Sequence, residues 1–393
     1  MSAHLPPVEA YRRDLARLRG TTSFGDEDDG WLLLAHVVRQ RAASGAPADV
    51  TPPADDAGAL RHLAARVATA PEIDGAIAAE LSDAALGMES AGALLLAAST
   101  LASLERALGD GHALERGRVV AQWARVERML GETDVAADLY ERVGRLGVRY
   151  KLPELRARAI LGLGVLARMR GNYPEARERF RRGLAVAERA GLAELTGLAH
   201  QSLMIAAAVA RDFDTALSHG WAALAHVAGD RVQEAEVLLN LATLCLDMGE
   251  DEAAIRGFVS AAERTTKERV RIAAKAGAAV AAARLGDRAA LAACVSEVEE
   301  ALRGEMAPYE RAQRLLTISD AWRAANDVTA AEAARERGVS IALAHGFAEL
   351  AHQYGEPVTP KERSPSTELV PLGADARRVV VALSGFGAPG LPG

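Results

Sequence analysis

The sequence has 393 residues, of which half are hydrophobic, a quarter are charged and only 4% are aromatic. Helix-forming residues such as Ala, Leu, Arg and Glu dominate, while the β-branched and aromatic residues favoured in sheets are sparse, so the composition predicts an all-α protein. The formal net charge of −7 argues against general binding to nucleic acid or to anionic membranes, since both reward a basic surface.

The first 71 residues contain three helical patterns, at residues 8–19, 31–43 and 57–69, separated by polar loops. The acidic run Asp26–Gly30 does not fit an EF-hand, because the twelfth place of that loop would be Val37 instead of glutamate. No continuous apolar stretch of the signal-peptide kind opens the chain, and the longest apolar run, residues 92–104, is shorter than the roughly 20 residues of a membrane span. From these features we expect a cytoplasmic protein.

Proline is concentrated at the two ends of the chain. Of the 15 prolines, only Pro153, Pro174 and Pro308 fall within residues 72–353. Because proline is excluded from helix interiors, this long stretch is free to be nearly continuous helix.

A short polar turn recurs along this stretch at nearly constant spacing. The turns lie at Gly131, Gly171, Arg211, Gly249, Gly286 and Asn326, at intervals of 40, 40, 38, 37 and 40 residues. The polar residues that follow them are Glu132, Asn172, Asp212, Glu250, Asp287 and Asp327. A fixed period of this length is typical of a repeat array, here one of helical hairpins.

Small residues recur on both sides of these turns. Seven residues before the turns stand Ala124, Gly164, Met204, Ala242, Ala279 and Ser319, and five residues after them stand Ala136, Ala176, Ala216, Ala254, Leu291 and Ala331; five of the six residues in each set are small. Two helices approach closely only where side chains are small, so these positions mark the expected helix crossings.

The motif formed by Gly162, Gly164 and Ala167 matches the spacing G-x-G-x-x-A of a dinucleotide-binding fingerprint. Such a fingerprint works only in the turn between a strand and a helix, where backbone N–H groups meet the pyrophosphate. Gly164 instead occupies a repeated crossing position in mid-helix, so we predict no nucleotide site and no cofactor.

The segment Ala159–Gly191 resembles a tetratricopeptide repeat, with the small Gly164, the turn at Gly171, and Ala176 and Phe180 at signature positions. The period near 40 residues is similar to the long-helix variety of this family. The other turns match less closely, and the resemblance covers roughly residues 72–351. It implies a right-handed α-solenoid of about seven stacked antiparallel hairpins over residues 72–353, with a concave face, lined by first helices, that binds peptides.

Placing the first-helix residues by this resemblance gives the expected lining of the concave groove. The predicted ligand-binding residues are Arg118, Arg125, Arg128, Met129, Arg158, Leu161, Val165, Arg168, Met169, Gln201, Ile205, Glu236, Thr243 and Asp247.

The arginines of this set lie near one end of the predicted groove. Arg118, Arg125 and Arg128 share one helix face, and guanidinium groups suit carboxylates and phosphates, so an acidic peptide segment or a C-terminal carboxylate is the expected partner. The alternative is that these arginines pair with nearby acids such as Glu115 and Glu127. Further along the groove the predicted charges are negative, at Glu236, Asp247 and Asp320. A groove with one basic end and one acidic end would orient a bound segment.

The last segment, residues 354–393, combines six prolines with scattered glycine and is expected to be largely disordered. Within it, Arg377–Leu383 has the composition of a short strand. This piece is either a transient extended segment or a tethered peptide that docks on a partner or on the chain's own groove.

No arrangement of catalytic or metal-ligating residues stands out. Cys245 and Cys294 lie in apolar helical runs, His219 and His226 are two helical turns apart, and His200 takes a core position. We therefore predict a non-enzymatic scaffold without a cofactor or metal, binding a protein or peptide in its groove. A regulatory sensor of a small ligand or signalling peptide, and a self-assembling structural protein, are the alternatives.

Overall fold

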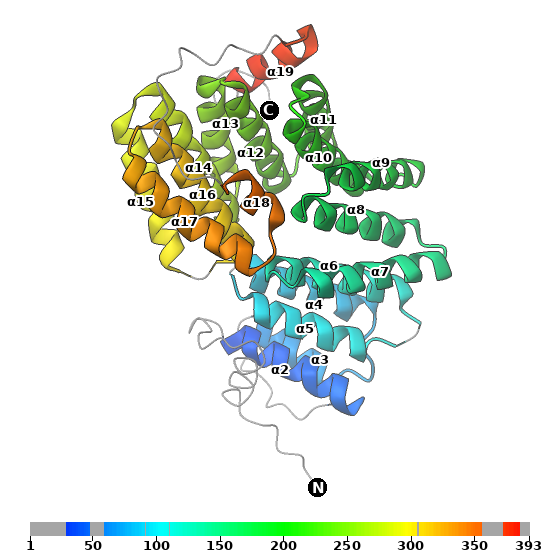
Figure 1. The fold of residues 1–393 in the computed structure, drawn as a ribbon. Coiled ribbons are helices and arrows are strands. Elements are labelled where there is room, and N and C mark those ends of the chain that lie inside the picture. Colours follow the sequence, from blue (N-terminus) through cyan, green and yellow to red (C-terminus); the bar gives the residue numbers. More distant parts are fainter. Residues whose placement is uncertain are drawn as a thin grey trace. The chain divides into compact units, whose positions relative to one another are not determined.

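The computed structural model describes residues 29–47, 59–90, 92–109, 111–304, 306–355 and 372–385. All secondary structure within these residues is helical, which confirms the predicted all-α class. The helices are α2 (Asp29–Ser44), α3 (Ala59–Thr69), α4 (Gly75–Ser90), α5 (Leu94–Ala107), α6 (Ala113–Met129), α7 (Thr133–Arg149), α8 (Pro153–Met169), α9 (Tyr173–Arg189), α10 (Ala193–Val209), α11 (Phe213–His226), α12 (Arg231–Met248), α13 (Asp251–Arg264), α14 (Glu268–Leu285), α15 (Arg288–Arg303), α16 (Pro308–Ala324), α17 (Val328–Ala344), α18 (Ala348–Gln353) and α19 (Ala374–Gly385) (Figure 1).

The chain forms two compact units, Met1–Gly162 and Leu163–Gly393, whose boundary falls inside α8. In the first unit α4 packs on α5 and α6 on α7, while α2 packs on α3 and α5. In the second unit the hairpins are α10 with α11, α12 with α13, α14 with α15, and α16 with α17. Each unit is thus a solenoid of consecutive antiparallel helix hairpins. The predicted helix at residues 8–19 lies outside the described residues.

The six repeated turns share one backbone conformation. The residues predicted at their centres, including the non-glycine Arg211 (φ 57°) and Asn326 (φ 63°), all have positive φ. In each turn the next N–H bonds the carbonyl five residues earlier, as Glu132 does with Glu127 at 2.9 Å, which closes the helix in a left-handed cap. Glycine is favoured at four of these centres because it adopts positive φ without strain.

The polar residue after each turn begins the next helix. The side chain of Asn172 accepts a hydrogen bond from the Glu175 N–H, and that of Asp287 accepts from two N–H groups. Asp212 and Asp327 cap α11 and α17 in the same way. At four of the six turns the polar side chain therefore satisfies N–H groups that the first helical turn leaves without a partner, whereas the side chains of Glu132 and Glu250 make no such hydrogen bond.

The predicted helix crossings are buried. Of the twelve positions, Ala124, Ala136, Ala176, Ala216, Ala242, Ala254, Ala279 and Ala331 have no exposed surface, and the other four are buried as well. Gly162, Gly164 and Ala167 lie inside α8, with no strand before them in the described residues. The prediction that this motif lies in mid-helix at a helix crossing is confirmed.

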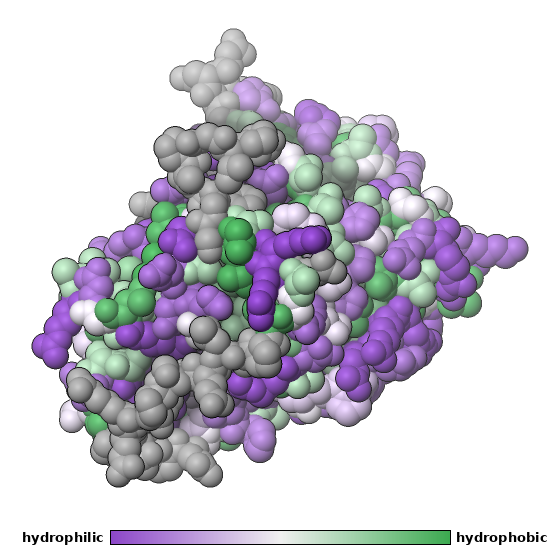
Figure 2. Space-filling view, turned by 90° about the horizontal axis from the view of Figure 1, so that it is seen from above, coloured by the Kyte–Doolittle hydropathy of each residue, from purple (hydrophilic) through white to green (hydrophobic). Residues whose placement is uncertain are grey.

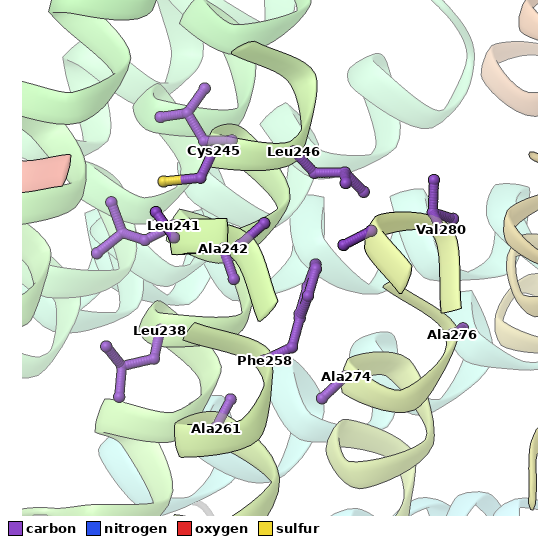
Figure 3. Packing of buried hydrophobic residues seen from close by; sticks show 14 of the residues in the cluster. Leu238, Leu241, Ala242, Cys245, Leu246, Phe258, Ala261, Ala274, Ala276 and Val280 are labelled. Carbon is purple, nitrogen blue, oxygen red and sulfur yellow. The ribbon is translucent and has the colours of Figure 1, made fainter. Parts of the chain in front are cut away.

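Aromatic rings fill the space that glycine leaves at several crossings. A Cβ built on Gly164 would lie 2.6 Å from the Phe180 ring, and one on Gly277 would lie 2.3 Å from the Phe258 ring. Figure 3 shows Phe258 projecting from α13 into the space between α12 and α14, near Ala242 and Val280. The rings are 1% exposed, so the small residues permit large apolar groups to be buried between neighbouring helices.

The predicted strand at Arg377–Leu383 is wrong, because this segment lies within helix α19. Ala376, Val379, Val380 and Leu383 are buried in the core of the second unit, at the spacing of one helix face. α19 packs on the second helices α11 and α13, and the Gly373 N–H donates to Asp214 at 3.0 Å. Tertiary contacts thus outweigh the strand preference of the valine run, while residues 356–371 and 386–393 lie outside the described part.

On the face shown in Figure 2, hydrophobic residues outside the grey segments occur in small groups between hydrophilic ones. In the described part of the chain, no helix combines the length and apolar content that a bilayer-spanning segment needs.

Alanine variants at two glycines of the first unit should distinguish the effect of close packing on stability from the effect of helix propensity. A Cβ on Gly162 would lie 2.3 Å from the Tyr140 ring, whereas one on Gly144 would meet only the Ala159 methyl at 3.4 Å. We expect Gly162→Ala to lower the free energy of unfolding by about 1–3 kcal/mol through overpacking, and Gly144→Ala to raise it by about 0.5–1 kcal/mol through helix propensity. Urea denaturation measures both, and equal effects of the two variants would contradict the crossing geometry.

Candidate functional site

The candidate site lies on the first helices of the second unit. α10 packs on α12, α12 on α14, and α14 on α16, so these helices form a continuous layer, while α19 covers the second helices α11 and α13. We use the name inner face for the first-helix residues Val165, Arg168, Gln201, Ile205, Glu236, Thr243, Asp247 and Asp320. The sequence placed all of these in the groove, with Asp320 among the acids at its far end.

Arg168 is held by a carboxylate from the short helix α18. Its Nη1 donates to Glu349 Oε1 at 2.6 Å and to Oε2 at 2.5 Å, and the Tyr309 hydroxyl donates to the same carboxylate at 3.2 Å. The side chains of Arg168 and Glu349 are 14% and 8% exposed. Burial raises the pKa of Tyr309, so the phenol stays protonated and remains a donor. We call Arg168, Tyr309 and Glu349 the clasp.

Apolar contacts surround the clasp. We use the name α18 segment for Phe347–Tyr354, which is helix α18 with the residue on each side of it. Phe347 and Leu350 of this segment pack with Met169 of α8 and with Ala312 and Leu316 of α16 in one buried cluster. Phe347 also meets the Tyr309 ring edge-on at a centroid distance of 5.1 Å. The α18 segment is therefore bound by an aromatic anchor and a desolvated ion pair, the combination that dominates many protein interfaces.

The residue after α18 binds an acidic part of the inner face. The Tyr354 hydroxyl donates to Asp320 Oδ2 at 2.6 Å, and Arg335 donates to the Tyr354 carbonyl at 2.9 Å. Burial raises the pKa of Asp320, although the hydrogen bond from Tyr354 and the charge of Arg323 oppose the shift. The Glu349 carboxylate thus binds the basic Arg168, and the Tyr354 hydroxyl binds the acidic Asp320 on the same inner face.

Asp247 is the second acidic group near Tyr354. Its side chain is exposed, yet surrounding protein desolvates it and raises its pKa to about 6, with Asp320 adding to the shift and Arg284 opposing it. A carboxylate that is open to solvent but costly to ionise is suited to a hydrogen-bond or cationic partner.

The other predicted groove residues of the second unit differ in exposure. Val165, Gln201, Ile205 and Glu236 are half-buried, and Thr243 is exposed. Glu236 is not free, since Lys267 Nζ donates to it at 2.9 Å and Arg269 pairs with it as well. The prediction that Met169 lines an open surface is wrong, because its side chain is fully buried against the α18 segment.

Three of the predicted arginines of the first unit meet a carboxylate, which lies on a neighbouring helix for Arg118 and Arg125 and on the same helix for Arg158. Arg118 binds Glu154 through Nε at 2.8 Å and Nη2 at 2.7 Å, and Arg158 donates to the same carboxylate at 2.9 Å. These bonds, that of Arg118 foremost, lower the pKa of Glu154. Arg125 pairs with the buried Glu89 at 2.6 Å. Pairing with acids, the alternative interpretation, is thus what the structure shows here.

The remaining predicted residues of the first unit lie at the ends or in the interior of helices. Arg128 and Met129 are half-buried at the end of α6. Leu161 is 2% exposed, so its predicted place on a groove surface is wrong. A side chain that is predicted to face a groove is buried instead when a neighbouring helix packs against that face of its own helix.

Three histidines come together on α10 and α11. His200 Nδ1 lies 3.0 Å from His219 Nδ1, and the His200 ring stacks on His226 at a centroid distance of 5.8 Å. Burial, assisted by neighbouring positive charge, lowers the pKa of both His200 and His219. Among the residues that the structure describes, no group of three His, Cys, Asp or Glu side chains is arranged to hold a metal.

Sequence reasoning missed Tyr309, Glu349 and Tyr354. The segment Phe347–Tyr354 follows the helix after the last repeated turn, and in the sequence it marks only the end of the array. Its signal is that Phe347, Glu349, Leu350 and Tyr354 stand within eight residues. Only the folded chain brings α18 to Arg168, which is 181 residues away from Glu349 in sequence.

No family model and no curated protein matches this chain. Among solved structures 34 chains match, including BtubC (BKLC) from P. vanneervenii. It is 17% identical, and the alignment covers 76% of this chain and 97% of that chain with a TM-score of 0.30. The architecture described above rests on this chain's own structure and not on that likeness.

The clasp can be tested by a double-mutant cycle. Removing one partner leaves a buried uncompensated charge, so we expect Arg168→Met and Glu349→Gln each to cost about 3–5 kcal/mol of unfolding free energy. We expect the double variant to cost clearly less than the sum, as contacting residues couple. The matched control is the exposed pair Arg66 and Glu80, for which we expect no measurable coupling energy. Additive effects of the two clasp variants would contradict the pairing of Arg168 with Glu349.

Asp247 gives a pH-dependent prediction. Because its pKa is about 6 in the folded chain and near 3.8 otherwise, the stability of the fold should fall as the pH rises from about 3.8 to about 6 and stay lowered above that. Asp247→Asn should therefore raise the melting temperature at pH 7.5, and most of the gain should be lost by pH 3.5, where the Asp247 carboxyl is neutral in the folded chain and mostly neutral in the unfolded chain. A gain that persists at pH 3.5 would show that the amide acts through packing and not through charge.

Proposed function

We propose that this chain is a non-enzymatic interaction scaffold whose inner face binds a short acidic helical segment of a partner protein. The observation that carries the proposal is the α18 segment itself. It occupies the predicted anchor Arg168 with a carboxylate and an aromatic residue supplied by the same chain. The surface therefore has the chemistry to hold such a segment, and a partner that carries the same groups would compete for it.

The resemblance to tetratricopeptide repeats supports this proposal, since that family binds peptides on the concave face of its first helices. The repeat period, the left-handed turns and the small crossing residues agree with the long-helix variety of that family. Solenoids in general offer extended surfaces of this kind to other chains.

The charges of the inner face would fix the direction of the bound segment. Arg168 takes a carboxylate, while Asp320 and Asp247 favour a donor. Glu349 of α18 meets Arg168, and Tyr354, the residue after α18 and five positions further on, meets Asp320. A partner segment with an acid followed by a tyrosine or a cation one to two turns later fits the same pattern.

The test uses a labelled synthetic peptide of residues 346–355, added to the full chain. Wild-type chain should bind it weakly, because the tethered α18 competes at a high effective concentration. In the variant Phe347→Ala/Glu349→Gln the internal segment is weakened, and we expect peptide affinity to rise at least tenfold in fluorescence anisotropy.

Two controls separate specific binding from exposure of apolar surface. Adding Arg168→Gln to the double variant should abolish binding, whereas adding Arg170→Gln on an exposed neighbouring residue should not. A peptide with glutamine in place of its glutamate should bind at least tenfold more weakly. Equal binding of both peptides by folded protein, checked by circular dichroism, would refute the proposal.

A further inference from the structure

Three histidines come together in the α10–α11 hairpin. His200 of α10 and His219 of α11 are half-buried, and His226, at the end of α11, is exposed. His200 stands eleven residues before its turn, where four of the five other repeats have an aliphatic residue, namely Val120, Ile160, Leu238 and Leu315. A titratable group therefore occupies a place at which the repeat pattern favours an apolar side chain.

The two half-buried rings share one hydrogen bond. His200 Nδ1 lies 3.0 Å from His219 Nδ1, and the ring centroids are 5.2 Å apart. A bond between two Nδ1 atoms needs a proton on one and a lone pair on the other, so one ring is held in its Nδ1–H tautomer. The bond survives one added proton, because an imidazolium can donate to the neutral ring. It is lost when both rings are imidazolium, since both Nδ1 atoms are then donors.

The packing of the hairpin leaves a doubly protonated pair little room to separate. The His226 ring stacks on His200 at a centroid distance of 5.8 Å. A Cβ built on Gly197 of α10 would lie 3.2 Å from the His226 Cβ, so the two helices approach closely one turn from the pair. Two positive rings in contact at this distance would repel each other in a partly desolvated place.

Charged groups of the packed helices act on the pair in both directions. His226 and Arg181 of α9 oppose its protonation, whereas Glu188 of α9 and Asp212, the N-cap of α11, favour it. α12 and α19 also pack on this hairpin, and none of their charged side chains in the described part of the chain contributes to either shift. Burial is the largest influence and outweighs the two acids, so the pKa of each ring is lowered.

We propose that the His200–His219 pair is a pH-sensitive latch, which holds the α10–α11 hairpin closed at neutral pH and loosens it in mildly acidic solution. A histidine whose pKa in the folded chain lies below its ordinary value of 6.5 gives stability that is present above that pH and is lost as the pH falls below it. α10 also carries Gln201 and Ile205 of the inner face, so acid would loosen this part of the face. The latch acts on the hairpin itself and does not depend on a bound partner.

Hydrogen–deuterium exchange of the full chain at pH 7.5 and pH 5.0 tests the latch, with rates corrected for the intrinsic pH dependence of amide exchange. Protection of residues 193–226 should fall by about tenfold or more at pH 5.0, and that of α14 and α16 by less than about twofold. In His200→Leu, which gives α10 the aliphatic residue of the other repeats, the fall in residues 193–226 should also be less than about twofold. The matched control His62→Leu alters an exposed histidine of the first unit and should keep the full effect. Asp247 titrates with the opposite sign, but all three proteins retain it, so its effect cancels in the comparison.

Nitrogen-15 NMR of the imidazole groups gives an independent measurement on the wild-type chain. At pH 7.5 one ring of the pair should show the Nδ1–H tautomer, and both rings should titrate below His62. Two Nε2–H tautomers at pH 7.5, or titration of both rings together with His62, would overturn the latch. So would protection of residues 193–226 that does not fall at pH 5.0, that falls equally in His200→Leu, or that falls no more than protection in α14 and α16.

Discussion

Close approach of paired helices at small residues is the constraint on which the structure depends. Positions such as Ala124, Ala242 and Ala279 are fully buried, and Gly164 and Gly277 lie against aromatic rings. Glycine inside a helix costs about 0.5–1 kcal/mol relative to alanine, whereas burying an aromatic side chain contributes on the order of 1.5–3 kcal/mol. The local cost is thus offset by packing, and the same pattern repeated about every 40 residues stacks one hairpin on the next.

Charge pairing follows from this stacking. Adjacent hairpins bring residues about 36 positions apart to the same surface, so Arg118 meets Glu154 and Arg125 meets Glu89. These acids are partly or fully buried, and the arginines satisfy them. An arginine that looks like a ligand anchor in the sequence can therefore be a structural partner of an acid one repeat away.

Three arginines illustrate the difference between structural and ligand-binding roles. Arg118 is paired within its unit at half exposure, Arg168 is paired with Glu349 of α18, and Arg41 is buried and donates to the Pro71 carbonyl. The first and third belong to the packing of their unit, and the second supports the proposed partner site. In each case the surroundings of the guanidinium, and not its presence on a helix, indicate the role.

The sequence by itself determined the helical class, the hairpin period and the turns, because these depend on local preferences: positive φ at Gly131 or Asn326, capping by Asn172 or Asp287, and small residues at fixed spacing. It did not give the burial of Leu161 and Met169, the helix at Arg377–Leu383 or the partner of Arg168. Those features were decided by tertiary structure alone, because they depend on which distant surface covers a residue. Local propensity contains no information about a contact such as Arg168 with Glu349, which forms only when the chain has folded.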